Sequence, residues 1–176
     1  MVKSTVWCPK LWQEIFDELL YNELDYEDQW TLHFDYNLTN EVTKEKRKTG
    51  WKVHSHCARG GFQCNTCSRR WSSVKVTVLF HYRLKKDQGT VIMRPFGQSC
   101  HRCSNEYNNK YYRPGFFEVE VKRALLRLFA KIRKNCYGEQ DDYDDKSEVR
   151  NKVLTKPHEA GLCEACQLGI CCKDVE

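Results

Sequence analysis

The chain has 176 residues, of which 40% are apolar, 12% aromatic and 30% charged, and its net charge is +5. This length suits a single domain with a modest core, and the composition excludes a disordered chain. No stretch approaches the roughly 18 consecutive apolar residues that a membrane span needs, so no transmembrane segment is predicted. The first twenty residues lack the apolar run of a signal peptide, so we expect a cytoplasmic protein whose thiols stay reduced.

The apolar pattern predicts an α+β fold, in which a small antiparallel sheet has two flanking amphipathic helices. Residues 10–22 carry apolar side chains at helical spacing, and residues 30–36 alternate as in a half-buried strand. A basic loop is expected at 43–50. The clearest strand is 74–84, and 91–93 is its predicted hairpin partner across a turn that contains Gly89.

A second amphipathic helix is predicted over residues 117–136, with basic side chains on much of its polar face. Its apolar face comprises Val121, Leu125, Leu128, Phe129 and Ile132. The acidic, turn-rich segment 139–157 that follows is expected to be a mobile linker inside a single domain of residues 1–176.

The eleven cysteines carry the strongest chemical signal. Three Cys-x-x-Cys pairs occur: Cys64 with Cys67, Cys100 with Cys103, and Cys163 with Cys166. This spacing lets both sulfurs turn toward one ion about 2.3 Å away. A thioredoxin-like redox site would need a βαβ unit, which the pattern lacks, so three pairs in a reduced chain favour zinc.

Closed structural zinc sites take four ligands each, and three pairs are two ligands short of two such sites. His158 and Cys171 flank the third pair and can fill the deficit. We therefore predict two structural zinc ions, and the spacing leaves the division of ligands between them open. The predicted ligands are Cys64, Cys67, Cys100, Cys103, His158, Cys163, Cys166 and Cys171. Reserve ligands, each favoured as a core or surface residue, are His56, Cys57, His81 and Cys172.

The positive charge is concentrated in residues 44–86, where twelve bases accompany one acid. Such a block is typical of a surface that binds an anionic partner, and an ordinary solvated surface is the alternative. A candidate nucleic-acid or anion-binding set lies here: Lys52, Arg59, Arg69, Arg70, Trp71 and Lys75. An aromatic ring beside cations can stack nucleobases. The alternative for Trp71 is a core residue packed beneath the zinc-binding turn of Cys64 and Cys67.

Motifs for catalysis are missing from the chain. It has no P-loop, no nucleophile elbow, no His-Glu-x-x-His and no zinc-deaminase signature. We therefore predict a protein that is not an enzyme and has no small-molecule substrate.

Five segments together resemble a known family: "WQEIFDELL", "WTLHFDYNL", "GFQCNTCSRRWSSVKVTVLFH", "VIMRPFGQSCHRC" and "HEAGLCEACQLGIC". They occur in the same order as in the receptor-transporting proteins, a branch of the three-CxxC zinc-binding family, and the type is that of the interferon-induced members. The resemblance covers residues 12–172. It places the seven predicted ligands other than Cys171 on the family's ligand positions, and Cys171 on a position that several members fill with cysteine.

The resemblance implies an accessory chaperone that binds cytoplasmic segments of G-protein-coupled receptors and promotes their trafficking to the cell surface. The alternative that it implies is an interferon-linked antiviral protein that binds RNA. Many members continue into a hydrophobic anchor, whereas this sequence stops at Glu176. We therefore expect a soluble member or an anchor outside this chain, with peripheral contact to the endoplasmic reticulum or plasma membrane through a partner or through anionic lipid.

Overall fold

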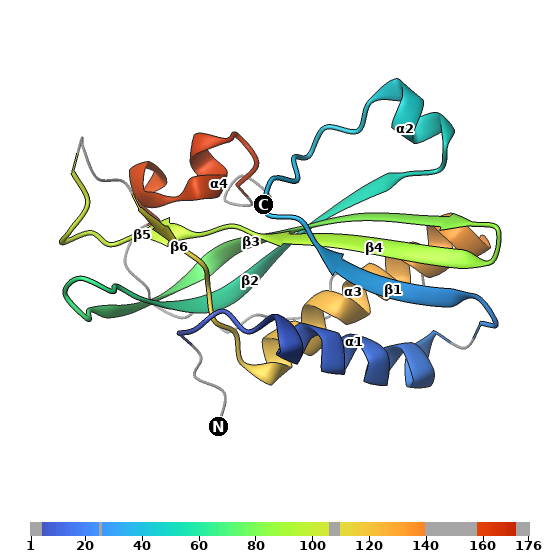
Figure 1. The fold of residues 1–176 in the computed structure, drawn as a ribbon, viewed down its shortest axis with the longest axis horizontal. Helices are drawn as coiled ribbons and strands as arrows, with labels where there is room; N and C mark the ends of the chain where they lie inside the picture. The colour runs from blue at the N-terminus through green and yellow to red at the C-terminus, as the bar shows by residue number, and fades with distance from the viewer. Residues whose placement is uncertain (1–4, 25, 106–109, 140–157, 172–176) are drawn as a thin grey trace.

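The computed structural model describes residues 5–24, 26–105, 110–139 and 158–171. Helices α1 and α3 cover one face of a sheet, and α4 lies against the other face (Figure 1). The elements in chain order are α1 (Pro9–Glu23), β1 (Gln29–Phe34), α2 (Lys44–Lys48), β2 (Lys52–Gln63), β3 (Arg70–Lys85), β4 (Gln88–Pro95), β5 (Gln98–Ser99), β6 (Tyr111–Tyr112), α3 (Glu118–Tyr137), the 3-10 turn η1 (Ala160–Leu162) and α4 (Glu164–Gln167).

The main sheet has four strands in the order β1-β4-β3-β2, and β5 pairs with β6 in a second, two-stranded sheet. The α+β class is confirmed. Strands β2, β3 and β4 are antiparallel, but β1 runs parallel to β4, so the sheet is mixed. A parallel neighbour needs a long crossover connection, which here consists of α2 and the β2–β3 hairpin.

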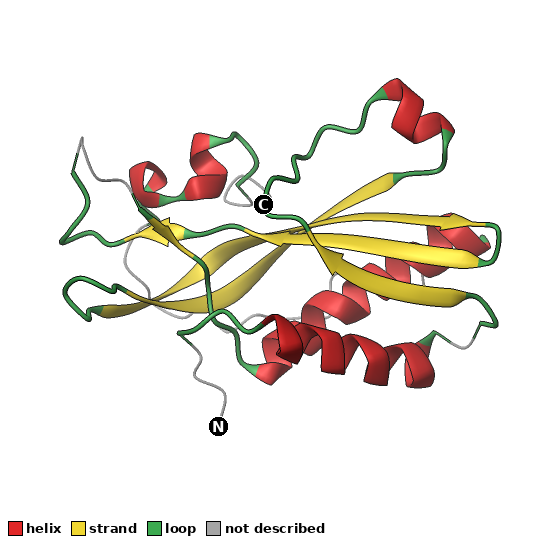
Figure 2. Ribbon diagram, viewed as in Figure 1, coloured by secondary structure: helices red, strands yellow, loops and turns green. Residues whose placement is uncertain are grey.

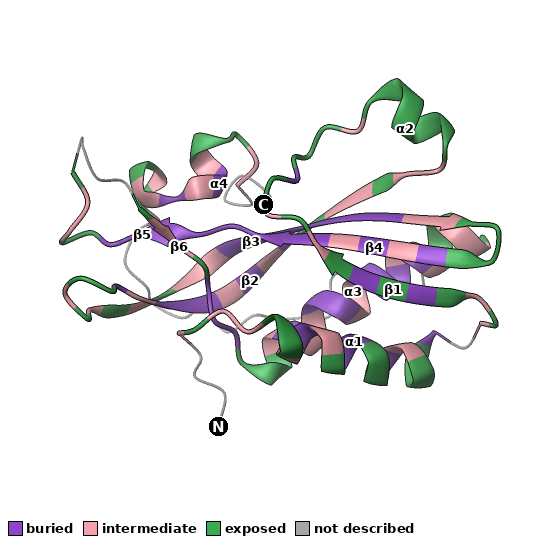
Figure 3. Cartoon of the chain, viewed as in Figure 1, coloured by how far each residue is buried: buried purple, intermediate pink, exposed green. Residues whose placement is uncertain are grey.

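The core lies between this sheet and the two long helices (Figure 3). The predicted stripe of the first helix is confirmed, since Trp12, Ile15 and Phe16 are at most 3% exposed. The predicted apolar face of α3 is fully buried against α1 and the sheet. Amphipathic periodicity therefore identified both helices correctly, because each buries one side only.

Three local expectations differ from the structure. Strand β2 was not predicted, because polar residues such as His54 and His56 interrupt its apolar alternation. The basic loop contains the short helix α2 (Figure 2). Its N-cap is Thr43, whose side chain accepts a hydrogen bond from the Lys46 N–H. The β3–β4 turn is formed by Lys86 and Asp87, both at positive φ, so Gly89 is outside it.

Gly89 has a packing role instead. It lies opposite Trp30 in the β1–β4 pair, and a Cβ atom at this position would lie 1.9 Å from Trp30 Cδ2. The buried indole ring thus occupies the space that any other side chain would fill.

A smaller core covers the opposite face of the sheet. Leu79 of β3 and Phe96 pack there with Leu38 and with Cys163 and Ala165 of the C-terminal segment. The predicted linker lies outside the described residues from position 140 to 157. Among the described helices, none is long and apolar enough to cross a membrane.

Candidate metal centres

The first candidate centre gathers Cys64, Cys67, Cys100 and Cys103, whose sulfurs all lie within 4.8 Å of one another. Cys64 and Cys67 belong to the turn between β2 and β3, and Cys100 directly follows β5. The centre therefore joins the tip of the long hairpin to the segment after the main sheet. Cys64 and Cys100 are buried, at 1% and 2% exposure.

The second candidate centre gathers His158, Cys163, Cys166 and Cys171 within the same 4.8 Å limit. All four residues come from one short segment that includes η1 and α4. This answers the question that the spacing left open. The first two Cys-x-x-Cys pairs form one group, and the third pair joins its own flanking histidine and cysteine.

The separations between side chains fit tetrahedral zinc. Two sulfurs about 2.3 Å from a tetrahedral ion lie about 3.8 Å apart, and a sulfur and an imidazole nitrogen lie about 3.6 Å apart. The Cys67–Cys100 and Cys163–Cys171 sulfur pairs lie at 3.7 and 3.8 Å. The His158 Nε2 atom lies 3.3 Å from Cys166 Sγ and 3.5 Å from Cys171 Sγ. The two groups therefore have the ligands and spacing of two zinc sites.

The three Cys-x-x-Cys turns share one backbone geometry. In each, the carbonyl of the first cysteine accepts a hydrogen bond from the N–H four residues on, namely Ser68, Ser104 and Gln167. Backbone N–H groups also point at the sulfurs, from Thr66 to Cys64 at 3.3 Å and from Cys166 to Cys163 at 3.4 Å. These donors stabilise thiolates, the form in which cysteine binds zinc.

The cysteine thiols in these groups differ in the direction in which their pKa is shifted. The backbone N–H of Cys67 is the main cause that lowers the pKa of Cys64. The pKa of Cys103 is raised, mainly by a hydrogen bond with Cys67, and burial raises the pKa of Cys163. Several thiolates cannot share so small a volume unless a cation balances their charge, which a divalent metal does.

The second centre is held to the sheet by a partly buried ion pair that the sequence did not reveal. Arg94, 8% exposed on β4, donates to the Leu38 carbonyl at 2.8 Å and to Glu164 Oε2 at 3.3 Å. The other Glu164 oxygen accepts from the Gly97 N–H at 2.9 Å. Arg94 therefore connects α4 and the loop after β1 to the same strand.

The reserve ligands that the structure describes, namely His56, Cys57 and His81, take no part in either group. His81 is hydrogen-bonded to the Thr39 carbonyl at 2.7 Å, His56 is buried on β2, and the Cys57 sulfur lies 3.6 Å from the Val74 carbonyl oxygen. Cys172 lies outside the described residues.

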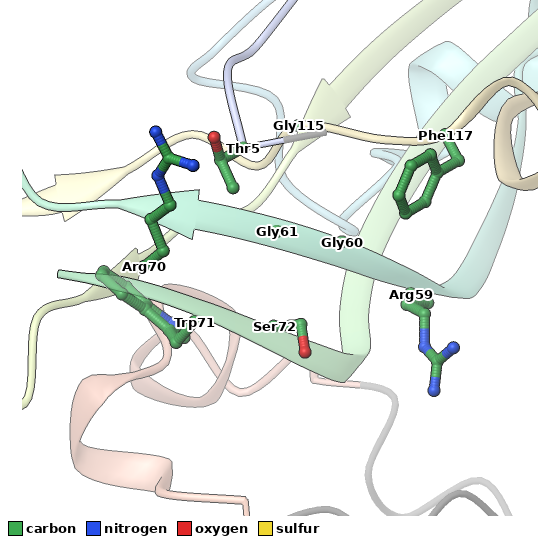
Figure 4. Close-up of a pocket in the computed structure, with 9 residues that line it drawn as sticks. All are labelled: Thr5, Arg59, Gly60, Gly61, Arg70, Trp71, Ser72, Gly115 and Phe117. Carbon is green, nitrogen blue, oxygen red and sulfur yellow. The ribbon is translucent and has the colours of Figure 1, made fainter. Parts of the chain in front are cut away.

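The candidate anion-binding set is only partly brought together. Arg59, Arg70 and Trp71 line one pocket (Figure 4). Lys52 begins β2, seven residues before Arg59, which is about 23 Å at about 3.3 Å per residue. Arg69 and Lys75 are outside the lining, Arg69 in the cysteine turn and Lys75 beside an irregularity in the β2–β3 register.

Comparison with known proteins places the cysteine pattern in a family. A family model described as a zinc-binding domain, the three-CxxC zinc ribbon, matches residues 57–169. The chain belongs to the three-CxxC zinc-binding family. The matched residues include all the candidate ligands except Cys171.

Within this family the chain is similar to receptor-transporting proteins, as the sequence motifs predicted. It is 36% identical to human receptor-transporting protein 4 over 163 residues, which cover 91% of this chain and 63% of that protein. It is 32% identical to mouse receptor-transporting proteins 3 and 1, over 99% and 90% of this chain and 36% and 58% of those proteins. The chain therefore spans 36–63% of the length of these relatives. No solved structure matches it.

Proposed function

We propose that this chain is a zinc-binding accessory chaperone that promotes the trafficking of G-protein-coupled receptors to the cell surface. The observation that carries the proposal is the three-CxxC domain in a chain similar to several proteins named receptor-transporting proteins. The eight clustered side chains are the zinc ligands. Zinc has a structural role here, because four protein ligands leave no open position for a substrate.

The zinc ions hold surface segments in place for a partner. The first centre fixes the β2–β3 tip, and the second fixes residues 158–171 on the sheet face opposite the long helices. The ions carry no reaction in this proposal, and the chain acts by binding rather than by catalysis.

Surface delivery of a receptor tests the proposal. An epitope-tagged G-protein-coupled receptor that reaches the surface poorly would be expressed alone or with this chain, and surface receptor would be counted by flow cytometry. We expect the chain to increase the surface count and Cys67→Ser to abolish the increase. The matched control is Cys8→Ser, since Cys8 belongs to neither cysteine group. An unchanged count with the parent chain would refute the proposed function.

An antiviral role through RNA binding is the second candidate. It is supported by Arg59 and Arg70, which lie beside Trp71 in one pocket. Against it, the Trp71 ring is stacked on Phe62 at 5.3 Å and 14°, and Tyr112 meets it edge-on at 6.3 Å. A nucleobase platform needs a free ring face. RNA held through phosphates would dissociate steeply as salt is raised, whereas a contact dominated by apolar burial would not.

Contact with an anionic membrane surface through α3 has weaker support. Three of its bases already have acidic partners: Lys122 with Glu118 at 3.3 Å, Arg123 with Glu120 at 3.0 Å and Arg133 with Glu139 at 3.9 Å. A cytoplasmic location, with attachment to the endoplasmic reticulum or plasma membrane through the receptor, is part of the main proposal.

A further inference from the structure

A small pocket opens between the β2–β3 hairpin and the segment that leads into α3 (Figure 4). Its volume is about 280 Å³, which is just under the range of sites for drug-sized ligands and suits one large side chain. Its lining includes the aromatic residues Trp71 and Phe117. Gly60, Gly61 and Gly115 also line it, and they have no side chains, so only their backbone does so. Reciprocal hydrogen bonds of 2.9 and 2.8 Å join Gly61 to Gly115, so this part of the pocket is rigid.

Exposed apolar side chains occur in the lining of the pocket and close to it in the sequence. Phe117 is 59% exposed although it lines the pocket. Val119 follows it in the first turn of α3, and Val6 adjoins the lining residue Thr5; they are 58% and 50% exposed. These three are the majority of the large exposed apolar side chains in the described residues, where Tyr21 and Leu168 are the others. Exposed apolar groups gathered in this way mark a surface that a partner covers.

The pocket also carries uncompensated positive charge. Arg59 and Arg70 have no acidic partner among the described residues, in contrast to the paired bases of α3. The carboxylate of Glu120 approaches the Arg59 backbone N–H at 3.5 Å, but it forms its ion pair with Arg123. A ligand that places two negative charges beside one apolar group would complement both features.

The separation of the two arginine backbones along the hairpin favours an extended ligand. In Figure 4 they start from opposite ends of the pocket, with Gly60 and Gly61 between them, and their side chains extend in opposite directions. Because Arg70 pairs with Gln63, four residues after Arg59, their backbones lie about 13 Å apart along the hairpin at about 3.3 Å per residue. In an extended peptide, residues i, i+2 and i+4 point to one side and cover the same length. A peptide with the pattern acidic-x-apolar-x-acidic spans this backbone separation.

We propose that this pocket binds an extended acidic peptide of a partner membrane protein. Its central apolar side chain enters beside Phe117, and its two carboxylates pair with Arg59 and Arg70. The identity of the partner as a receptor rests on the proposed function. Cytoplasmic segments next to a membrane span carry an excess of Lys and Arg, so the bound segment comes from a tail remote from the membrane.

Peptide binding tests this directly. A fluorescein-labelled peptide Gly-Glu-Ser-Phe-Ser-Glu-Gly would be titrated with the zinc-loaded chain and followed by fluorescence anisotropy. We expect Arg59→Gln and Arg70→Gln each to weaken binding about tenfold, because each removes a charge-assisted contact. Replacing the peptide's Phe by Ser should weaken it at least as much. Phe117→Ser should weaken it too and still fold, since Ser is a better helix N-cap than the present Phe117.

Matched controls separate this pocket from general positive charge. Arg69→Gln and Lys52→Gln each remove one charge outside the pocket, and they should leave peptide affinity unchanged within about twofold. The inference is overturned by undetectable peptide binding, or by equal affinity in the parent chain and the Arg59→Gln/Arg70→Gln double variant. It is also overturned if single-stranded oligouridine binds more tightly than the peptide and Arg69→Gln weakens that binding as much as Arg70→Gln does.

The receptor assay distinguishes failure of the pocket from failure of the proposed function. The parent chain and Lys52→Gln should increase surface receptor, and the double variant should not. If the double variant increases it equally, the pocket inference is wrong and the trafficking proposal stands. If the parent chain gives no increase, the trafficking proposal is wrong, and the peptide titration alone decides whether the pocket binds as inferred.

Discussion

Loss of the second zinc centre should release the C-terminal segment without unfolding the rest of the protein. Residues 158–171 are fourteen residues, and ordering them costs at least about 14 kcal/mol at about 1–2 kcal/mol each. Only Cys163 and Ala165 in this segment are buried, and such small side chains return about 3 kcal/mol at most. At this lower bound about 11 kcal/mol remains, which the Arg94–Glu164 ion pair and zinc supply together, since a structural zinc ion supplies roughly 10–16 kcal/mol.

Cys166→Ser is the perturbation, and amide hydrogen exchange read by mass spectrometry is the assay. We expect peptides from 158–171 to exchange within seconds in the variant, while the core of β3 stays protected, because the main core lies on the opposite face. Cys8→Ser, which removes a thiol outside both groups, should exchange like the parent chain. Loss of protection in β3 together with 158–171 would refute this reasoning, because the two faces would then unfold as one unit.

Three further substitutions test the packing that supports the centres. Gly89→Ala should lower the free energy of unfolding by about 3 kcal/mol in urea titrations, because its Cβ would overlap the Trp30 ring. Arg94→Met should cost about 3 kcal/mol by the same measurement, because it leaves a partly buried carboxylate unpaired. Burial lowers the pKa of His54 to about 4, so the unfolded state binds more protons between about pH 6.5 and 4. Stability should therefore fall by up to about 3 kcal/mol as pH drops through that range, and His54→Leu should remove this part of the loss.

Each substitution has its own control or contradicting result. Gly161→Ala places a Cβ where no atom lies within 4 Å, so it should be neutral; an equal loss at Gly161 and Gly89 would contradict the steric account. Lys122→Met removes an exposed ion pair and should change stability by under about 1 kcal/mol. If Arg94→Met is equally mild, the ion pair does not hold α4. An unchanged pH slope in His54→Leu would show that other groups cause the acid loss.

Local periodicity predicted the elements that bury one side. The first helix and the helix α3 show this, because the spacing of their apolar residues is set by the helix itself. The strand β3 was also predicted, although its centre is buried on both faces. Cysteine spacing predicted the eight residues that the structure gathers into two groups, for a similar reason, but it left their division between the groups open. A Cys-x-x-Cys turn is a local structure whose geometry depends on few other residues.

Features that depend on distant contacts could not be predicted in this way. The parallel pairing of β1 with β4 joins residues nearly sixty positions apart, and nothing in either strand specifies the partner. Gly89 was assigned to a turn because its contact with Trp30 is visible only once those strands are paired. The ion pair of Arg94 with Glu164 spans seventy positions, so neither residue stood out among the many charges.

Native mass spectrometry of the zinc-loaded chain tests the central claim most directly. Two independent zinc centres predict two zinc ions in the parent chain. They also predict one ion in each of two double variants, Cys64→Ser/Cys67→Ser and Cys163→Ser/Cys166→Ser. A parent chain with a single ion, or a double variant that retains two, would contradict the division of these ligands into two sites.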